Sequence, residues 1–363
     1  MVASHSRNSR KSRAPATGPT LQAARGSKLR IASLFATAVV CAAPAHAQNF
    51  YEGKTVTILV GSDVGGGFDA FARLLSRHLG RALPGAPTFV VENMPGAGSA
   101  IAAGHLYARA PKDGTYIGAF VPSGLLMPLF EGRAANYDTT KFQFLGSANA
   151  SARLCVSYKG AKVASWADAM KQRVIVGAGA VASASYDYAW LHKNLHQGLF
   201  DVVAGYKGTA EILLAMERGE VEATCGLDRS SLRAQRPDVM RNNGFNYLLR
   251  MAVKPEPELD ALGVPEASSF ARNERDRAVS DLIAAQQVFG RPYLVAPGVP
   301  VERVGLLRAA FEATMRDPRL ASEAAALGLD IDSANGARVT EAINNIYAAP
   351  AAVIDGARAA IRP

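Results

Sequence analysis

The chain has 363 residues, of which 49% are hydrophobic, and a formal net charge of +9. This length is typical of two domains of ordinary size, and the apolar content is sufficient for a buried core. No stretch approaches the roughly 18 consecutive apolar residues of a membrane-spanning helix, so no transmembrane helix is predicted.

The N-terminal segment has the pattern of a secretory signal. A basic flank, Arg25 to Arg30, precedes an apolar run over residues 31–43 that is too short to span a bilayer. Ala45-His46-Ala47 then supplies a signal-peptidase site, so the mature chain is expected to begin near Gln48. The alternative, a buried N-terminal helix, leaves the basic flank and the cleavage pattern unexplained. Residues 1–47 are therefore predicted to be a signal peptide, and the protein to be periplasmic.

Most of the positive charge belongs to this segment. Residues 1–47 hold seven of the 40 Lys and Arg residues and none of the 31 Asp and Glu residues, which leaves 33 basic against 31 acidic side chains, or +2. So small an excess does not favour nucleic-acid binding, and no nucleic-acid partner is expected.

Two cysteines remain in the predicted mature chain, Cys155 and Cys225, because Cys41 falls within the signal. An even pair in an oxidising compartment permits a disulfide. The alternative is two buried thiols in separate strands, and the spacing alone does not choose between them.

Short β-rich runs alternate with helical patterns through the first part of the mature chain. Strand, helix, strand, helix and strand are predicted in turn over residues 55–60, 68–79, 88–91, 99–108 and 115–121. This order implies a parallel sheet with helices on its faces.

The alternation restarts after a join near residues 148–153. Strands are predicted over residues 154–158, 173–176, 201–205 and 221–225, with helices over 166–171, 185–194 and 209–218. Residues 254–280 are rich in proline and charge and are expected to form an irregular surface segment. A strand over 288–295 and helices that begin at Pro300 and Asp317 follow.

Four small-residue turns lie between predicted strands and helices. They are Gly65-Gly66-Gly67, Gly96-Ala97-Gly98, Gly177-Ala178-Gly179 and Tyr206-Lys207-Gly208. Small residues let a ligand approach the backbone, and unpaired N–H groups at a helix start favour an anion. Because open α/β sheets bind ligands at the carboxyl ends of their strands, the four turns together predict an anion-binding cleft. The alternative is that these glycines serve only to turn the chain.

Enzymatic sites are less well supported. Residues 177–182 resemble a GxGxxA dinucleotide motif, but the next strand ends at Gly205-Tyr206, where the motif needs an acidic residue. No GxSxG nucleophile elbow is present. His192 and His196 have the i,i+4 spacing that can hold zinc, but without a third ligand they are expected on an exposed helix face. No catalytic residue, cofactor or metal is predicted.

Several longer motifs, in this order, resemble the solute receptors of the tripartite tricarboxylate transporters, also called Bug receptors. The motifs are residues 54–73 (KTVTILVGSDVGGGFDAFAR), 91–98 (VENMPGAG), 111–115 (PKDGT), 206–208 (YKG) and 293–300 (YLVAPGVP). Each motif is unspecific alone, but together they cover nearly all of the predicted mature chain.

The resemblance implies an α/β, type II periplasmic-binding fold, in which two lobes joined by a hinge close around a small organic acid. Lobe 1 is expected over residues 48–151 and about 252–363, and lobe 2 over about 152–251, with hinges near residue 150 and between 226 and 290. The resemblance further implies a monomeric receptor, without cofactor or catalysis, that delivers its ligand to membrane permease subunits. A sensing partner of a membrane kinase is the alternative within this fold, and a secreted enzyme is less favoured.

Matching the family motifs position by position implies a ligand site built from both lobes. It comprises Val64, Gly65, Gly66, Gly67, Asp69, Gly96, Ala97, Gly98, Ser99 and Ser123 in lobe 1, and Gly177, Gly179, Ala180, Ser183, Tyr206, Lys207 and Gly208 in lobe 2. Backbone amides are expected to bind most of the carboxylate, helped by Ser123, Ser183 and Lys207. Asp69 is also expected to stabilise the helix start that it occupies.

The chain departs from the family pattern at three places. Val64 and Gly205 stand where the family often has proline, and Tyr186 lies near the place of a histidine. The second-lobe turn also has fewer hydroxyl groups than the family pattern. These differences predict a ligand that is larger or less polar than a C4 dicarboxylate.

Overall fold

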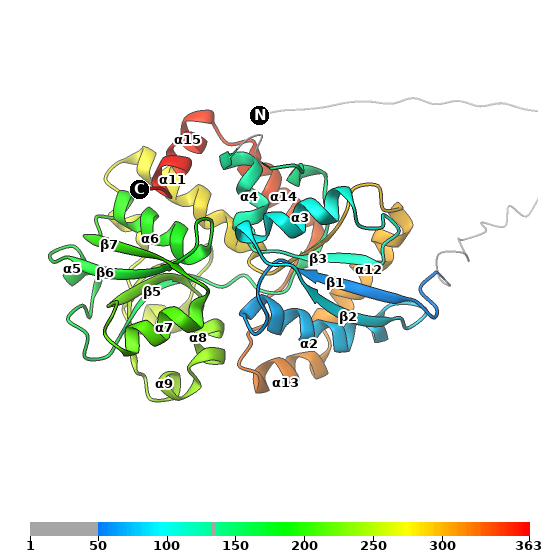
Figure 1. Ribbon diagram of the computed structural model, residues 1–363, viewed down its shortest axis with the longest axis horizontal. Coiled ribbons are helices and arrows are strands. Elements are labelled where there is room, and N and C mark those ends of the chain that lie inside the picture. The colour runs from blue at the N-terminus through cyan, green and yellow to red at the C-terminus, as the bar shows by residue number, and fades with distance from the viewer. Residues whose placement is uncertain (1–49, 132–134) are drawn as a thin grey trace, which may run out of the picture. The chain divides into compact units, whose positions relative to one another are not determined.

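The computed structural model describes residues 50–131 and 135–363, and the predicted signal peptide, residues 1–47, lies outside these ranges. Two mixed β-sheets flanked by helices form the framework (Figure 1). We call the first sheet with its helices lobe 1 and the second sheet with its helices lobe 2. None of the described helices is both long and apolar enough to cross a membrane.

The sheet of lobe 1 has six strands in the order β11-β4-β10-β3-β1-β2. Strands β1, β2 and β3 are parallel, and β10 runs antiparallel between β3 and β4. Strand β1 is buried along nearly its whole length, which explains why it is a continuous run of apolar and β-branched residues. The strands are β1 (Thr55–Val60), β2 (Thr88–Asn93), β3 (Tyr116–Ala119), β4 (Gln143–Ser147), β10 (Pro292–Val295) and β11 (Ala334–Asn335).

The sheet of lobe 2 has five strands in the order β7-β6-β8-β5-β9. Strand β6 is parallel to β7 and β8, whereas β5 is antiparallel to β8 and β9. A disulfide joins Cys155 of β5 to Cys225 of β8, and both residues are fully buried. The strands are β5 (Arg153–Tyr158), β6 (Val174–Gly179), β7 (Phe200–Tyr206), β8 (Ala223–Leu227) and β9 (Phe245–Met251).

Helices connect the strands and cover the sheets. In the strand-rich part of lobe 1 they are α2 (Gly67–Ala82), α3 (Ala100–Ala108) and α4 (Pro122–Glu131). In lobe 2 they are α5 (Trp166–Ala169), α6 (Ala184–Leu195), α7 (Thr209–Glu217), α8 (Arg229–Gln235) and α9 (Pro237–Arg241). The later helices are α10 (Pro257–Ala261), α11 (Glu274–Ala285), α12 (Val301–Met315), α13 (Pro318–Ala326), α14 (Gly336–Tyr347) and α15 (Ala351–Ala360). Helix α15 contacts α4 of lobe 1, α6 of lobe 2 and α11, so it bridges the two lobes (Figure 1).

The structure differs from the sequence prediction in several segments. No element was predicted where the structure has strands β4 and β9 and helices α4, α8, α9, α14 and α15. Residues 254–280, predicted to be irregular, contain α10 and the first half of α11. Asn273 caps helix α11, and the first turn of the helix is charged. Because of these charges, the sequence pattern did not indicate the buried residues that follow in the same helix. Residues 177–179, predicted to be a turn, instead end strand β6 and are buried. A Cβ atom on Gly177 would lie 2.9 Å from the side chain of Ile212, so close packing explains this glycine.

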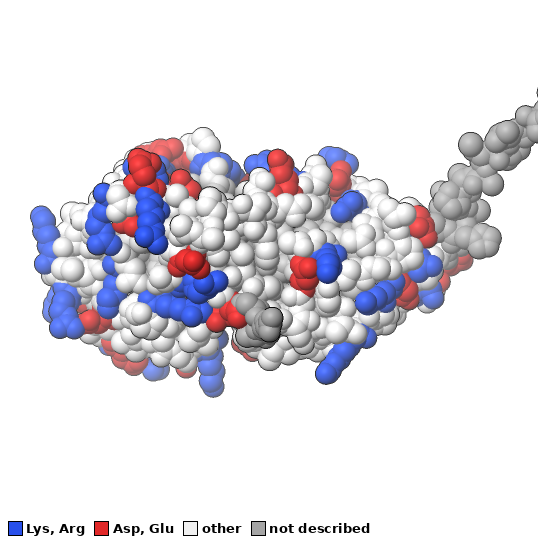
Figure 2. Space-filling model, turned by 90° about the horizontal axis from the view of Figure 1, so that it is seen from above, with Lys and Arg blue, Asp and Glu red and all other residues white. Residues whose placement is uncertain are grey.

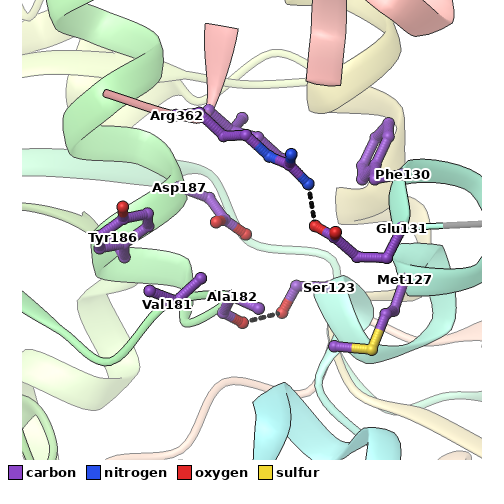
Figure 3. A pocket seen from close by; sticks show the side chains of 10 residues that line it. Ser123, Met127, Phe130, Glu131, Val181, Ala182, Tyr186, Asp187 and Arg362 are labelled. Atoms are coloured by element: carbon purple, nitrogen blue, oxygen red, sulfur yellow. Dashed lines mark hydrogen bonds and ion pairs between the residues drawn. The ribbon is translucent and has the colours of Figure 1, made fainter. Parts of the chain in front are cut away.

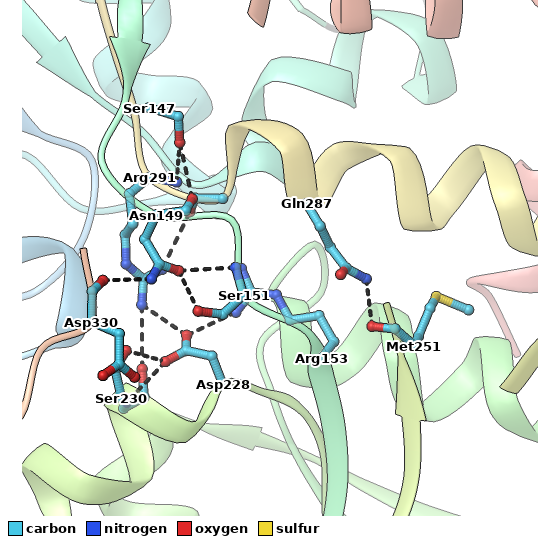
Figure 4. A network of polar contacts seen from close by, with 12 residues as sticks. Ser147, Asn149, Ser151, Arg153, Asp228, Ser230, Met251, Gln287, Arg291 and Asp330 are labelled. Carbon is cyan, nitrogen blue, oxygen red and sulfur yellow. Dashed lines mark hydrogen bonds and ion pairs between the residues drawn. The ribbon is translucent and has the colours of Figure 1, made fainter. Parts of the chain in front are cut away.

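The chain passes between the two sheets twice, from β4 to β5 and from β9 to β10. Hydrogen bonds tie these crossings together (Figure 4). The backbone N–H of Arg291 donates to Ser147 Oγ at 3.1 Å, and the N–H of Ala148 donates to the carbonyl of Arg291 at 2.9 Å. Gln287 Nε2 donates to the carbonyl of Met251 at 2.8 Å.

A buried charge network lies beside these crossings (Figure 4). Asp228 Oδ2 accepts from Arg153 Nη1 at 3.0 Å and from Arg291 Nη2 at 2.9 Å. The other carboxylate oxygen accepts from Ser230 Oγ and from the N–H of Ser231. Burial raises the pKa of Asp228, but the two arginines and the two hydrogen bonds outweigh burial and hold it well below its ordinary value. The ionised Asp228 carboxylate therefore links Arg153 to Arg291.

The surface carries charges of both signs. In the view of Figure 2, basic and acidic side chains of the described residues are interspersed, and a broad central area carries few charges. This distribution matches the small net charge of residues 48–363.

Candidate functional site

Loops at the carboxyl ends of strands from the two lobes meet at one point. Ser123 Oγ, at the start of α4, donates to the carbonyl oxygen of Ala182 at 2.7 Å (Figure 3). A Cβ atom on Gly98 would lie 2.4 Å from that same oxygen, so glycine is needed for this approach. The structure thus brings Gly98 and Ser123 of lobe 1 against the turn at residues 180–183 of lobe 2.

The turn at residues 96–99 has an unusual backbone. Gly96, Ala97, Gly98 and Ser99 all have positive φ, with values of 132°, 46°, 58° and 82°. For residues that carry a Cβ atom this conformation costs roughly 1–2 kcal/mol. Ser99 offsets the cost, because its Oγ donates to the carbonyl of Gly61 and accepts from the N–H of Val121, both at 2.9 Å. The Ser99 hydroxyl therefore shapes lobe 1, and because Ser99 is fully buried it is not exposed to a ligand.

Asp69 also acts within lobe 1. Its carboxylate accepts from the N–H of Gly65 and from Arg73 Nε, both at 2.9 Å, and from Asn93 Nδ2 at 3.0 Å. Burial raises the pKa of Asp69, but these hydrogen bonds outweigh burial and lower it overall. Asp69 thus holds the glycine loop in place, as expected from its position in the first helical turn.

The glycine loop itself is largely open to solvent. Val64 is 69% exposed, and a Cβ atom on Gly65 would meet no other atom within 4 Å. Gly66 is partly buried, and Gly67 begins α2 beside Arg291, whose guanidinium lies 2.8 Å from the position that a Cβ atom on Gly67 would take. Only the end of this loop therefore reaches the junction of the lobes.

The serine hydroxyl groups of the second-lobe turn accept hydrogen bonds from the backbone of the same connection. Ser183 caps α6, and its Oγ accepts from the N–H of Tyr186 at 3.3 Å. Ser185 Oγ accepts from the N–H of Gly179 at 2.9 Å. Ala180 is exposed. Both serines therefore stabilise the β6–α6 connection.

The turn Tyr206-Lys207-Gly208 lies apart from the lobe contact. Lys207 and Gly208 are exposed, and a Cβ atom on Gly208 would meet nothing within 4 Å. The N–H of Lys207 donates to Glu211 Oε2 at 2.6 Å. The structure does not bring this predicted turn into the pocket beside Ser123.

A small pocket, with a cavity volume of about 30 Å³ and open to solvent, lies beside the lobe contact (Figure 3). Its walls come from α4, from the start of α6 with the turn before it, and from the segment that follows α15. The lining residues are Ser123, Met127, Phe130, Glu131, Val181, Ala182, Tyr186, Asp187, Ile361 and Arg362. Of these only Ser123 was among the predicted site residues. Asp187 could have been found from its place in the first turn of the helix that Ser183 caps, whereas Glu131 and Arg362 carried no signal.

Three of the residues that line the pocket are Asp, Glu or Arg. Glu131 and Arg362 form an ion pair, and the Asp187 carboxylate points into the space beside them (Figure 3). Asp187 is only 8% exposed. Burial, and next the charge of Glu131, raise its pKa to about 8, although Arg362 opposes this shift.

The histidine pair does not lie where it was predicted. His192 and His196 are buried, not on an exposed helix face, and their Nδ1 atoms are 2.8 Å apart. Burial lowers the pKa of His192 well below its ordinary value and that of His196 to about 4, so both rings are neutral near pH 7. In the described part of the chain, His192 groups with Cys155 and Cys225 at metal-ligand spacing, but the disulfide occupies both sulfurs.

Comparison with known proteins identifies the fold. No family model and no curated protein sequence matches the chain. A solved periplasmic transporter protein is 22% identical with a TM-score of 0.62, covering 85% of this chain and 96% of its own. MatC from Rhodopseudomonas palustris with bound malate is 18% identical, with a TM-score of 0.62 and coverage of 85% and 99%. An R. palustris protein with adipate is 21% identical, with a TM-score of 0.62 and coverage of 81% and 94%. The predicted fold is therefore confirmed: this chain has the two-lobed architecture of periplasmic solute-binding proteins.

Proposed function

We propose that this protein is an extracytoplasmic receptor that captures a small organic acid and presents it to a membrane transporter of the tripartite tricarboxylate type. The observation that carries the proposal is the pocket beside the Ser123–Ala182 contact, because lobe 1 and lobe 2 both line it. A site shared by two lobes binds its ligand most completely when the lobes close. Two solved structures of this fold contain malate and adipate, which supports an acid as the ligand class.

The pocket also supports a ligand with an apolar part. Met127, Phe130, Val181 and Ile361 line it together with the ring of Tyr186. A C4 dicarboxylate has little surface to bury against such walls, whereas a longer or aromatic acid has more. This agrees with the ligand size expected from the second-lobe turn.

Thermal unfolding of residues 48–363 tests the proposal. A ligand at 100 times its dissociation constant should add about 2.7 kcal/mol to the free energy of unfolding and raise the midpoint clearly. The panel contains dicarboxylates, aliphatic and aromatic monocarboxylates, amino acids, NAD and zinc. We expect one class of acid to raise the midpoint. Failure of every acid would contradict the proposal, and a shift from NAD alone would favour an enzyme.

The approach of the lobes makes Gly98 a sensitive position. In a Gly98→Ala variant the new Cβ would lie 2.4 Å from the carbonyl oxygen of Ala182, so the lobes should not reach the observed contact. We expect ligand affinity to fall by about tenfold or more, which corresponds to about 1.4 kcal/mol. Isothermal titration calorimetry with the acid found in the panel measures this change.

Gly160→Ala is the matched control. Gly160 also has a positive φ, 88°, but a Cβ atom there would meet nothing within 4 Å. Both variants should lose roughly 1–2 kcal/mol of stability through backbone strain, and only Gly98→Ala should lose affinity. Equal affinities in the two variants would show that the contact between the loops is not needed for binding.

A further inference from the structure

Three acidic or basic side chains from separate elements face the same pocket. Glu131 ends α4 in lobe 1, Asp187 lies in the first turn of α6 in lobe 2, and Arg362 follows α15 (Figure 3). Glu131 and Arg362 pair with each other across the pocket. Within residues 50–131 and 135–363, by contrast, the Asp187 carboxylate accepts no hydrogen bond, and its neighbours in charge are Glu131 and Arg362.

An unpaired carboxylate in this position is costly. A buried charge without a partner loses its hydration and gains nothing in return, so it either takes up a proton or finds a cation. Arg362 supplies one positive charge for two carboxylates, and it is already paired with Glu131. When Glu131 and Asp187 are both ionised, one of the two negative charges therefore has no positive partner.

The charge balance restricts which acid can bind. A dicarboxylate would add two negative charges beside Glu131, whose repulsion would oppose it, and it would leave Asp187 in its protonated form without an ionic partner. A protonated amine on the ligand would instead pair with Asp187 through charge-assisted hydrogen bonds. The guanidinium of Arg362 has further N–H donors for the ligand carboxylate, because it offers five in all.

We infer that the ligand is an organic acid that also carries a protonated amine, with its ammonium group at Asp187 and its carboxylate near Arg362. The apolar walls formed by Met127, Phe130 and Val181 would then contact the rest of the ligand. This inference rests on the proposed receptor function and specifies the class of ligand.

Matched pairs of ligands test the inference by calorimetry on residues 48–363. Each pair consists of an aliphatic or aromatic amino acid and the same acid without its amine, such as leucine with 4-methylpentanoate and phenylalanine with 3-phenylpropanoate. Malate and adipate are measured alongside. We expect at least one amino acid to bind tenfold or more tightly than its deaminated partner.

The Asp187→Asn variant tests the role of the carboxylate. It keeps the shape of the side chain but removes the charge, so the amino acid should lose at least tenfold in affinity while its deaminated partner loses none. Asp201→Asn, in the same lobe, changes an exposed aspartate that pairs with Arg173, and should alter neither affinity. Circular dichroism and the thermal midpoint confirm that both variants fold.

The outcomes separate this inference from the function on which it rests. Equal or tighter binding of the deaminated acids, or binding of the dicarboxylates alone, would overturn the inference and leave the receptor function standing. An unchanged preference in Asp187→Asn would overturn the assignment to Asp187. Failure of every acid, with or without an amine, would overturn both the inference and the receptor function.

Discussion

Replacing Asp228 by alanine is expected to lower the free energy of unfolding by about 3–5 kcal/mol, because it leaves buried positive charge without a partner. Arg153 and Arg291 both bind the same carboxylate oxygen, and their side chains are only 9% and 4% exposed. Asp228 also caps α8 by accepting from the N–H of Ser231 at 2.7 Å. The variant therefore loses a cap together with the ion pairs.

Chemical denaturation followed by tryptophan fluorescence measures this loss. Asp238→Ala is a suitable control, because Asp238 pairs with Arg241 at the surface and both side chains are at least 70% exposed. Exposed pairs contribute about 0–1 kcal/mol, so the control should unfold nearly as the parent protein does. A change below about 1 kcal/mol in Asp228→Ala would show that the two arginines find other partners or water.

Removing the disulfide is expected to cost about 4 kcal/mol in a Cys155→Ala, Cys225→Ala double variant. The two cysteines are 70 residues apart in the sequence, and a bridge across a loop of that length strongly restricts the unfolded chain. Both sulfurs lie in the core of lobe 2, where β5 pairs with β8, so the variant also loses buried contacts.

Thiol titration and denaturation together check this prediction. The folded, oxidised protein should expose no reactive thiol, whereas unfolding with a reductant should release two per chain of residues 48–363. The Cys155→Ala and Cys225→Ala single variants are controls that retain one buried thiol each. Two reactive thiols in the protein as purified from an oxidising compartment would contradict a bridge, and an unchanged unfolding midpoint in the double variant would contradict its stabilising role.

Much of the fold was predictable because the local patterns are strong. The apolar run at Thr55–Val60 and the helical stripe that follows it correspond to β1 and α2, and the βα alternation predicts most later elements in order. Strand β10 was predicted as a strand, but its position between β3 and β4 depends on contacts between distant residues. The boundaries of the two lobes along the chain stay a prediction.

The site was less predictable than the fold. Of the four predicted turns, the one at residues 96–98 lies at the contact with Ala182, whereas the turn at residues 206–208 lies apart from it. Ser99 and Asp69 satisfied their hydrogen bonds within lobe 1, which sequence patterns do not reveal. The charged pocket joins residues near 131, 187 and 362, and no local motif links positions so far apart. The part that each predicted residue plays in ligand binding stays a prediction.

The position of β10 also determines the order in which the chain can fold as it emerges from the membrane, N-terminus first. Strand β4 ends at Ser147, but its neighbour β10 begins only at Pro292, and all five strands of lobe 2 lie between them. A chain that emerges from its N-terminus can therefore complete the lobe 2 sheet while β3 and β4 still have no strand between them. Until residue 295 is available these two strands keep unpaired edges, which attract other chains. Lobe 1 should thus be the last part to fold and the part most in need of chaperone protection.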